Sequence, residues 1–195
     1  MSLISSKPLV SVLMNGYNCE LYLNETIDSV YSQSYENWEI IFVDNMSSDR
    51  TADIVKKYDN KIKYYKTEKK LNLGEARNFG LSKCRGDYIS FLDTDDLWLC
   101  EKLKKQLLTF QKNEDVKITY SSGYFINKDS TLVGEFKTSY NTRNCYRRNI
   151  ANYEVNLQSL IFEKSILNNQ EKIKFDNKLT HVEDLDLFLK IALKN

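Results

Sequence analysis

The sequence predicts an α/β fold in which a mostly parallel central sheet carries helices on both faces. Short apolar segments rich in β-branched and aromatic residues alternate with segments of helical periodicity through the first 115 residues. Strand and helix alternate four times, and repeats of this kind build a parallel sheet with right-handed crossovers. From residue 116 onward the alternation ends, so the strands expected there are antiparallel or mixed.

The first half of the chain is expected to hold four strands and four helices. The strands are near-continuous apolar runs, which suits a sheet buried on both faces, and they cover residues 8–14, 38–44, 62–68 and 87–93. The helices are expected over residues 20–34, 47–59, 73–84 and 98–113. Ser47 or Ser48 is expected to cap the N-terminus of the second helix.

The second half is expected to contain fewer helices and strands than the first. Residues 117–127 and 131–137 resemble two strands joined by a three-residue turn, and residues 182–195 have the spacing of an amphipathic helix. The single proline and the absence of a low-complexity linker give no sign of a domain boundary. We therefore expect one domain with two halves, residues 1–115 and residues 116–195.

Composition narrows the class of protein. The 195 residues include 28 basic and 27 acidic side chains, and this balance argues against a nucleic-acid-binding protein. The four cysteines are scattered and His181 is the one histidine, so a zinc site is not expected. Scattered thiols fit a reducing cytoplasm, and no apolar run approaches the roughly 20 residues of a membrane span. A cytoplasmic location is the expectation.

Three aspartates, at positions 93, 95 and 96, follow the apolar run of the fourth expected strand. Asn15 and Asp44 likewise stand at the carboxyl ends of expected strands, and ligands of open α/β sheets bind at that edge. Carboxylates this close repel one another and need a compensating charge. A hard divalent cation, Mg²⁺ or Mn²⁺, held together with a diphosphate would supply that charge.

The acidic segment is also compatible with roles that involve no nucleotide. A solvated turn is the common role of such a segment. An EF-hand loop is excluded because Trp98 and Lys104 stand where glycine and glutamate are required. Phosphatases of the haloacid dehalogenase type also have an Asp-x-Asp segment after an apolar strand, but that strand is usually the first of the domain and here it is the fourth.

Five segments together resemble the family 2 glycosyltransferases, the inverting enzymes of the GT-A fold. The segments are "VSVLMNGYN" at 10–18, "IIFVDNMSSD" at 40–49, "GEARNFGL" at 74–81, "YISFLDTDD" at 88–96 and "VEDLDLFLK" at 182–190. Each is weak alone, but their order spans nearly the whole chain. The resemblance implies a Rossmann-like sheet, with a nucleotide-sugar-binding half at residues 1–115 and an acceptor-side half at residues 116–195.

The resemblance also implies roles for single residues. Asp44 corresponds to the aspartate that contacts the base, and Arg77 to the arginine that helps hold the nucleotide. Asp93 and Asp95 form the DXD motif, which supplies ribose and metal contacts, with Asp95 the expected metal ligand. Asp184 corresponds to the usual catalytic base, with Glu183 beside it as the alternative. The remaining nucleotide-binding candidates are Asn15, Tyr17 and Thr94.

The implied reaction is transfer of a hexose from a nucleotide sugar, expected to be a UDP-sugar, with Mn²⁺ or Mg²⁺ as cofactor. The implied acceptor is a carbohydrate or a lipid-linked molecule in the synthesis of a cell-surface polysaccharide or glycoconjugate. Typical members continue well beyond the Glu-Asp helix, so a truncated chain or an unusually short enzyme is expected. A peripheral membrane contact, if the enzyme makes one, is expected in C-terminal residues that this sequence does not include.

Two departures from the family pattern surround the expected base pocket. Residues 15–18 are "NGYN" where members commonly have "PTYN", and residues 44–47 are "DNMS" where they commonly have "DDGS". These changes motivate a rival function, a degenerate relative that binds a nucleotide without transferring a sugar. A metal-dependent phosphatase or nucleotidyltransferase is the second rival.

Several of these residues also suit purely structural roles. Glu183 and Asp184 fit the first turn of a helix, and Arg77 fits a surface position paired with Glu75 or Glu68. Trp98 is expected in the core or at its rim. Most tyrosines are expected to be rim residues without a sugar-stacking role, among them Tyr120, Tyr124, Tyr140, Tyr146 and Tyr153.

Overall fold

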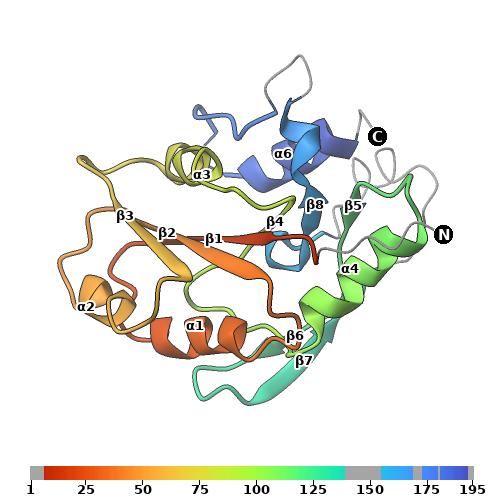
Figure 1. The fold of residues 1–195 in the computed structure, drawn as a ribbon. Coiled ribbons are helices and arrows are strands. Elements are labelled where there is room, and N and C mark those ends of the chain that lie inside the picture. Colours follow the sequence, from red (N-terminus) through yellow and green to blue (C-terminus); the bar gives the residue numbers. More distant parts are fainter. Residues whose placement is uncertain (1–6, 139–154, 169–172, 180, 193–195) are drawn as a thin grey trace.

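The computed structural model describes residues 7–138, 155–168, 173–179 and 181–192. Its main feature is a six-stranded sheet with the order β3-β2-β1-β4-β8-β5 (Figure 1). The strands from the first half of the chain are β1 (Val10–Gly16), β2 (Trp38–Asp44), β3 (Ile62–Lys66) and β4 (Tyr88–Phe91). All four are parallel where they pair, as predicted.

The strand order reverses direction at β1. The chain adds β2 and β3 on one side of β1 and then returns to place β4 on the other side. Such a switch opens a crevice at the carboxyl ends of the two central strands. Leu13 of β1 pairs with Phe91 of β4, so Asn15 and Asp93 each follow two residues later at this edge.

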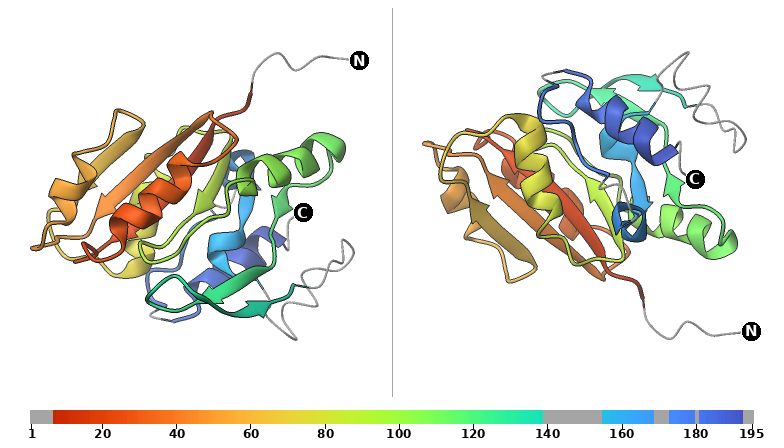
Figure 2. Two further views of the ribbon diagram at one scale, coloured as in Figure 1. Left: turned by 90° about the horizontal axis from the view of Figure 1, so that it is seen from below. Right: turned by 90° about the horizontal axis from the view of Figure 1, so that it is seen from above.

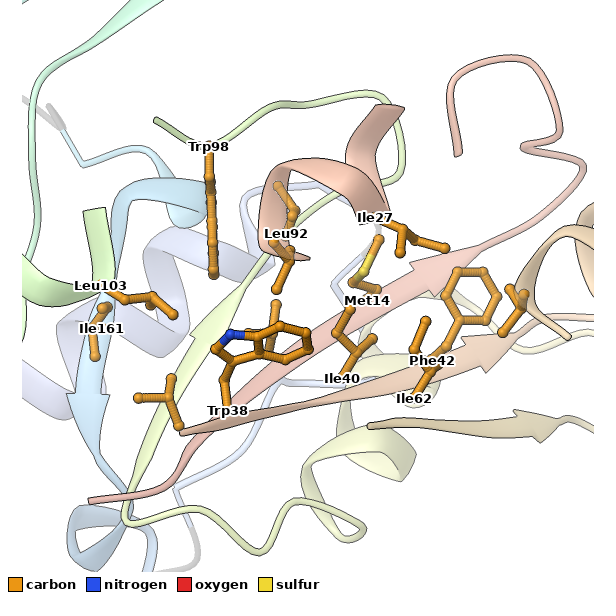
Figure 3. Packing of buried hydrophobic residues seen from close by; sticks show 14 of the residues in the cluster. Met14, Ile27, Trp38, Ile40, Phe42, Ile62, Leu92, Trp98, Leu103 and Ile161 are labelled. Atoms are coloured by element: carbon orange, nitrogen blue, oxygen red, sulfur yellow. The ribbon is translucent and has the colours of Figure 1, made fainter. Parts of the chain in front are cut away.

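Helices cover both faces of the sheet (Figures 1 and 2). One face carries α1 (Leu23–Tyr31), α2 (Thr51–Val55) and α4 (Lys102–Lys112), and their apolar residues form one buried cluster with β1 and β2 (Figure 3). The other face carries α3 (Leu73–Leu81) and α6 (Glu183–Ala192) over a second cluster. No helix in the described parts of the chain is long and apolar enough to cross a membrane.

The second half of the chain completes the same sheet. β8 (Ile161–Glu163) inserts antiparallel between β4 and β5 (Ile118–Thr119). The strand predicted over residues 117–127 is therefore wrong as a single strand, because its start joins the main sheet as β5. Its later part forms β6 (Gly123–Ile126), which pairs with β7 (Leu132–Phe136) in a separate two-stranded hairpin. Two 3-10 helices, η1 (Leu157–Ser159) and η2 (Lys164–Asn168), flank β8.

The boundaries predicted from the sequence differ most from those in the structure at α2. The predicted helix over residues 47–59 is reduced to five residues, and the proposed cap at Ser47 or Ser48 is wrong because Arg50 occupies the N-cap position. The reason is that Ser47, in the segment before α2, makes its hydrogen bonds to residues outside the helix. The backbone N–H of Ser47 donates to Asp44, and its hydroxyl accepts from the backbone N–H of Asn18.

Helix α3 is fixed at both of its ends. At its N-terminus Asn72 and Glu75 form a capping box, with the Asn72 side chain 2.8 Å from the Glu75 backbone nitrogen. Near its C-terminus Gly80 packs onto β1, where an added Cβ would lie 2.2 Å from a methyl carbon of Leu13. This close approach sets the position of Arg77, one turn earlier.

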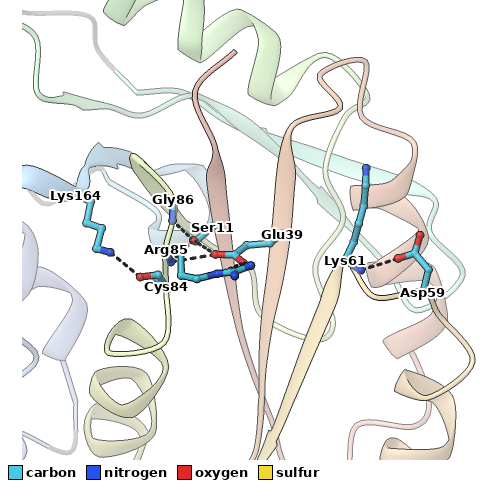
Figure 4. Close-up of polar contacts among 8 residues, drawn as sticks. All are labelled: Ser11, Glu39, Asp59, Lys61, Cys84, Arg85, Gly86 and Lys164. Carbon is cyan, nitrogen blue, oxygen red and sulfur yellow. Dashed lines mark hydrogen bonds and ion pairs between the residues drawn. The ribbon is translucent and has the colours of Figure 1, made fainter. Parts of the chain in front are cut away.

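The buried carboxylate of Glu39 pairs with the exposed side chain of Arg85, away from the carboxyl edge of the sheet (Figure 4). Glu39 is 3% exposed, accepts from Arg85 Nη2 at 2.7 Å and accepts from the Ser11 hydroxyl at 2.8 Å. Burial by itself raises the pKa of Glu39, but the hydrogen bonds from Arg85 and Ser11 outweigh it and hold the pKa below its usual value. The network ties the turn after α3 to β1 and β2.

Candidate active site

Arg77 joins the two acidic segments that the sequence singled out. Its Nη1 lies 2.8 Å from Glu183 Oε1 at the start of α6, and its Nη2 lies 3.3 Å from Asp93 Oδ1 after β4. The guanidinium also lies over the Phe175 ring, 5.4 Å from its centroid. Because the Arg77 side chain is only 6% exposed, the alternative of a surface arginine paired with Glu75 or Glu68 is wrong.

Carboxylates accumulate around this arginine. Burial, together with the charges of Asp95 and Asp184, raises the pKa of Asp93, and Arg77 opposes that rise. Burial, followed by the charges of Asp93 and Asp95, raises the pKa of Asp96 to about 6. The single guanidinium is already shared with Glu183, so the site still has an excess of negative charge that a further cation would relieve.

Gln158 is a site residue that the sequence analysis missed. Its side-chain nitrogen donates to Asp93 Oδ2. Its backbone is held at two points, because its N–H donates to the Asn156 side chain at 2.9 Å and its carbonyl accepts from the Trp98 indole at 3.2 Å. No local pattern marks this residue, because it is a lone glutamine in a short 3-10 helix.

Asp184 lines a cavity of about 450 Å³. Its Oδ1 accepts from the backbone nitrogen of Leu185 at 2.8 Å, and it stands in the first turn of α6 beside Glu183. The residue before this helix, Val182, has φ 56, a left-handed conformation that is rare and strained for a β-branched residue. The backbone therefore turns sharply just before the acidic pair.

Asp44, the expected base contact, is the last residue of β2 and is fully buried. One carboxylate oxygen accepts from the Ser47 backbone nitrogen at 2.7 Å, and the other accepts from the Tyr64 hydroxyl. Burial, followed by this hydrogen bond to Asp44, raises the pKa of Tyr64 above its usual value. Tyr64 thus covers Asp44 in this structure, a pairing that no sequence pattern indicates.

The two departures from the family pattern have local structural roles. Asn45 uses both ends of its amide, donating to the Leu71 carbonyl at 2.8 Å and accepting from the Leu71 backbone nitrogen at 2.8 Å, which an aspartate could not do. Gly16 has no room for a side chain, because an added Cβ would lie 2.7 Å from Cys19 Sγ and 2.8 Å from the Phe42 ring.

The remaining nucleotide-binding candidates lie on the loops at this edge. Asn15 is half-buried, and its Nδ2 is buried without a hydrogen-bond partner in the described part of the chain. Tyr17 is 48% exposed with the Lys70 ammonium 3.9 Å from its ring centroid. Thr94 is half-buried, and its carbonyl accepts from the Thr26 hydroxyl at 3.0 Å.

The aromatic residues and the histidine have mixed positions. Trp98 is buried in the core, as expected, and the Tyr120 ring packs against Phe188. Tyr124 is 51% exposed on the hairpin, and His181 is exposed near the start of α6. Tyr140, Tyr146 and Tyr153 lie outside the described residues.

The donor set fits a divalent cation that is shared with a ligand. Within the described ranges, no group of three or more His, Cys, Asp or Glu side chains forms a cage that would hold a metal by itself. Asp93 is half-buried and Asp95 is exposed, and one or two carboxylates completed by phosphate oxygens and water suit Mg²⁺ or Mn²⁺. These two residues are the ones that would hold the ion.

Comparison with known proteins decides the family. The model of the family described as glycosyl transferase family 2 matches residues 11–183. The chain belongs to glycosyl transferase family 2. Its mostly parallel sheet, flanked by helices and accompanied by the small β6–β7 sheet, is the GT-A fold.

Proteins from several organisms are similar to this chain. An uncharacterized glycosyltransferase of Methanocaldococcus jannaschii is 33% identical over 94% of this chain and 64% of its own length. An Escherichia coli UDP-Glc:alpha-D-GlcNAc-diphosphoundecaprenol beta-1,3-glucosyltransferase is 32% identical over 96% of this chain and 71% of its own length. The structure of S. aureus TarS 1-349 in complex with UDP is 26% identical, with a TM-score of 0.78.

The chain spans only part of the length of these proteins. It aligns over 94% of its own residues with TarS 1-349 but covers 55% of that structure. It also covers less than two thirds of the M. jannaschii protein.

Proposed function

We propose that this protein transfers a hexose from a UDP-sugar to a hydroxyl of a carbohydrate or lipid-linked acceptor, with inversion at the anomeric carbon and with Mn²⁺ or Mg²⁺ as cofactor. The observation that carries the proposal is the bridge that Arg77 makes between Asp93 and Glu183. It brings the acidic segment at the sheet edge and the acidic pair of α6 to the two ends of one guanidinium.

The donor would lie in the crevice between the carboxyl ends of β1 and β4. Asn15 offers a buried donor nitrogen there, and Tyr17 and Thr94 stand on the adjoining loops. Asp44 would accept a hydrogen bond from the uracil imide nitrogen once the Tyr64 hydroxyl moves away from it. Arg77 would act mainly by holding Asp93 and Glu183, because its guanidinium is already engaged by both.

Asp93 and Asp95 would hold the divalent cation together with the donor diphosphate. Bound there, the cation would act as a Lewis acid that stabilises the charge of the leaving diphosphate. The local excess of carboxylates supports this assignment, since the neighbouring aspartate charges add to burial, the largest cause, in raising the pKa of both Asp93 and Asp96. Asp95 is the more exposed of the two proposed ligands and therefore the better variant for a test.

Asp184 would accept the proton of the attacking hydroxyl as a general base. The acceptor oxygen would form its bond to the anomeric carbon while the bond to the diphosphate breaks, which inverts that carbon. Glu183 is less suited to this role, because it is 8% exposed and its carboxylate bonds to Arg77. Asp184, by contrast, lines an open cavity that an acceptor could enter.

The names of the relatives support a place in cell-surface polysaccharide synthesis. The E. coli relative is named for transfer of glucose to a sugar on diphosphoundecaprenol, and a Bacillus subtilis relative is a putative teichuronic acid biosynthesis glycosyltransferase. TarS has also been crystallised with UDP-GlcNAc. A lipid-linked acceptor would bring the enzyme to a membrane surface.

Calorimetric titration of UDP with and without Mn²⁺ tests the metal and the nucleotide together. We expect UDP to bind more tightly with Mn²⁺ than with EDTA, and we expect Asp95→Ala to lose most of that enhancement. Asp115→Ala, which removes an exposed carboxylate after α4, is the matched control and should keep it. Equal UDP affinity with and without metal in the parent protein would remove the cation from the proposal.

A further inference from the structure

The cavity that contains Asp184 has walls from three distant parts of the chain. Its polar lining is Lys137, Asn156, Gln158 and Asp184, and its apolar lining is Phe136, Val155 and Leu157. A volume of about 450 Å³ is in the range of sites for small molecules. Of these residues, only Asp184 has a role in the reaction as proposed above.

The aromatic part of the lining is Phe136, which belongs to the β6–β7 hairpin, where each of two phenylalanines is paired with a glycine. Gly123 pairs with Phe136, and Phe125 pairs with Gly134, so both rings belong to the same face of the hairpin. The Phe136 ring lies over Gly123, where an added Cβ would be 2.5 Å from two ring carbons. The centroids of the two rings are 5.6 Å apart, and Phe125 is exposed.

The polar part of the lining is connected to the DXD motif. The Gln158 side chain donates to Asp93, and its backbone is held by Asn156 and by Trp98. A side chain fixed at these points has a defined orientation before any ligand arrives. The cavity therefore has an aromatic surface, hydrogen-bonding amides and a carboxylate suited to a general base, and Gln158 connects it to a proposed metal ligand.

We propose that this cavity is the subsite for the sugar ring of the acceptor, with Phe136 as its stacking surface and Gln158 and Asn156 as its hydrogen-bonding side. A pyranose has apolar C–H faces and a rim of hydroxyl groups, and this lining matches both. An alkyl chain would leave the amides and Asp184 without polar partners in the ligand, which is unfavourable for polar groups that the ligand buries. The inference rests on the proposed function, because it takes Asp184 to be the base that meets the acceptor hydroxyl.

Phe136→Leu tests the stacking surface, because it keeps an apolar side chain and removes the ring. The probes are methyl glycosides of N-acetylglucosamine, glucose and galactose, measured by saturation-transfer NMR with UDP and Mn²⁺ present. We expect the parent to bind at least one of them and Phe136→Leu to bind it about three- to tenfold more weakly, because the stacking contact of the ring is lost. UDP affinity should not change.

Two further variants separate stacking from damage to the hairpin. Tyr124→Leu removes a ring from the other face of the same hairpin and should bind the glycoside like the parent protein. Phe136→Tyr keeps the ring and should also bind like the parent. Equal losses in Phe136→Leu and Tyr124→Leu, or no loss in Phe136→Leu, would overturn the subsite.

The same experiment distinguishes failure of the subsite from failure of the proposed function. Glycoside binding that depends on Phe136, in a protein that releases no UDP from UDP-glucose or UDP-GlcNAc, would support the subsite and count against transfer. Metal-dependent UDP binding with no binding of any of the three glycosides would overturn the subsite and leave the donor site in place.

Discussion

Arg77 and Glu183 form a buried ion pair, 2.8 Å between Nη1 and Oε1, across 106 positions of the chain. Arg77 belongs to α3, whose position on the sheet is set by the close contact between Gly80 and Leu13. Glu183 begins α6 and stands immediately before the proposed base. The pair therefore fixes the start of α6 relative to the sheet edge, and with it the distance between Asp184 and the DXD motif.

The first prediction concerns this pair. Arg77→Met should destabilise the fold by about 3–5 kcal/mol, because it leaves the buried Glu183 carboxylate without its partner. Glu183→Gln should cost less, and the double variant should be more stable than the sum of the two single effects by about 1 kcal/mol or more. Urea denaturation of all four proteins measures the coupling. Strictly additive effects would show that the two side chains do not interact in solution.

The first strands of the sheet could be predicted because each is recognisable from its own short stretch of sequence. β1, β2 and β4 are buried on nearly every residue, and near-continuous apolar runs are typical of strands covered on both faces. β8 and β5 have three and two residues, too few for a period to be visible, and their pairing depends on contacts between segments far apart in the chain.

The second prediction concerns the base. Asp184→Asn keeps the size of the side chain but cannot take a proton at neutral pH, so the rate of sugar transfer should fall by about 10²–10⁴-fold. UDP affinity should change little, because the diphosphate is expected at the opposite side of the sugar. Transfer to the acceptor and calorimetric titration with UDP measure the two effects separately.

Asp186→Asn is the matched control for this variant. Asp186 lies half a turn later in α6 and forms an ion pair with Lys190 at 2.6 Å, on a helix that both variants leave intact. It should transfer at nearly the parent rate. Near-parent transfer by Asp184→Asn would show that the acidic pair only begins the helix, the structural alternative that its position also allows.

The third prediction concerns the choice of nucleotide base. If the uracil imide replaces the Tyr64 hydroxyl at Asp44, Tyr64→Phe removes the competitor, and UDP affinity should rise by up to about tenfold, the value of roughly one hydrogen bond. Tyr65→Phe, on the same strand but packed against the other cluster, should have no effect. Competition among UDP, CDP and ADP should favour UDP in the parent, and Asp44→Ala should abolish that preference. An unchanged ranking in Asp44→Ala would exclude Asp44 from base recognition.

The site could be predicted only as far as its motifs reach. Asp93, Asp95 and Asp184 stand in short segments whose composition is informative on its own. Tyr64, Gln158 and the partners of Arg77 could not be found in this way, because each acts through a contact with a residue at least 16 positions away. Asn45 differs from the family pattern for a reason that only the Leu71 backbone reveals.

The fourth prediction concerns Lys102, at the start of α4. Its ammonium lies 3.3 Å from the Ser90 hydroxyl and 4.1 Å from the centroid of the Trp98 ring, and burial lowers its pKa from 10.5 to about 7. Between these two pH values the unfolded chain binds a proton that the folded chain does not. The free energy of unfolding should therefore rise with pH from about 7 to 10.5, by at most about 1.4 kcal/mol per pH unit from this residue.

Lys102→Met removes this contribution and should be more stable than the parent at pH 7, because no charge has to be desolvated. Its advantage should shrink as the pH rises toward the ordinary lysine pKa of about 10.4, because the lysine of the unfolded parent chain then loses its proton as well, and folding no longer has to remove it. Urea denaturation of both proteins at several pH values measures the difference between their free energies of unfolding. The titration of other groups affects both proteins equally and cancels in this difference. Lys104→Met, on the same helix with a side chain that is 53% exposed, should show no such trend. A constant difference between Lys102→Met and the parent across this pH range would mean that Lys102 keeps its ordinary pKa in the folded protein.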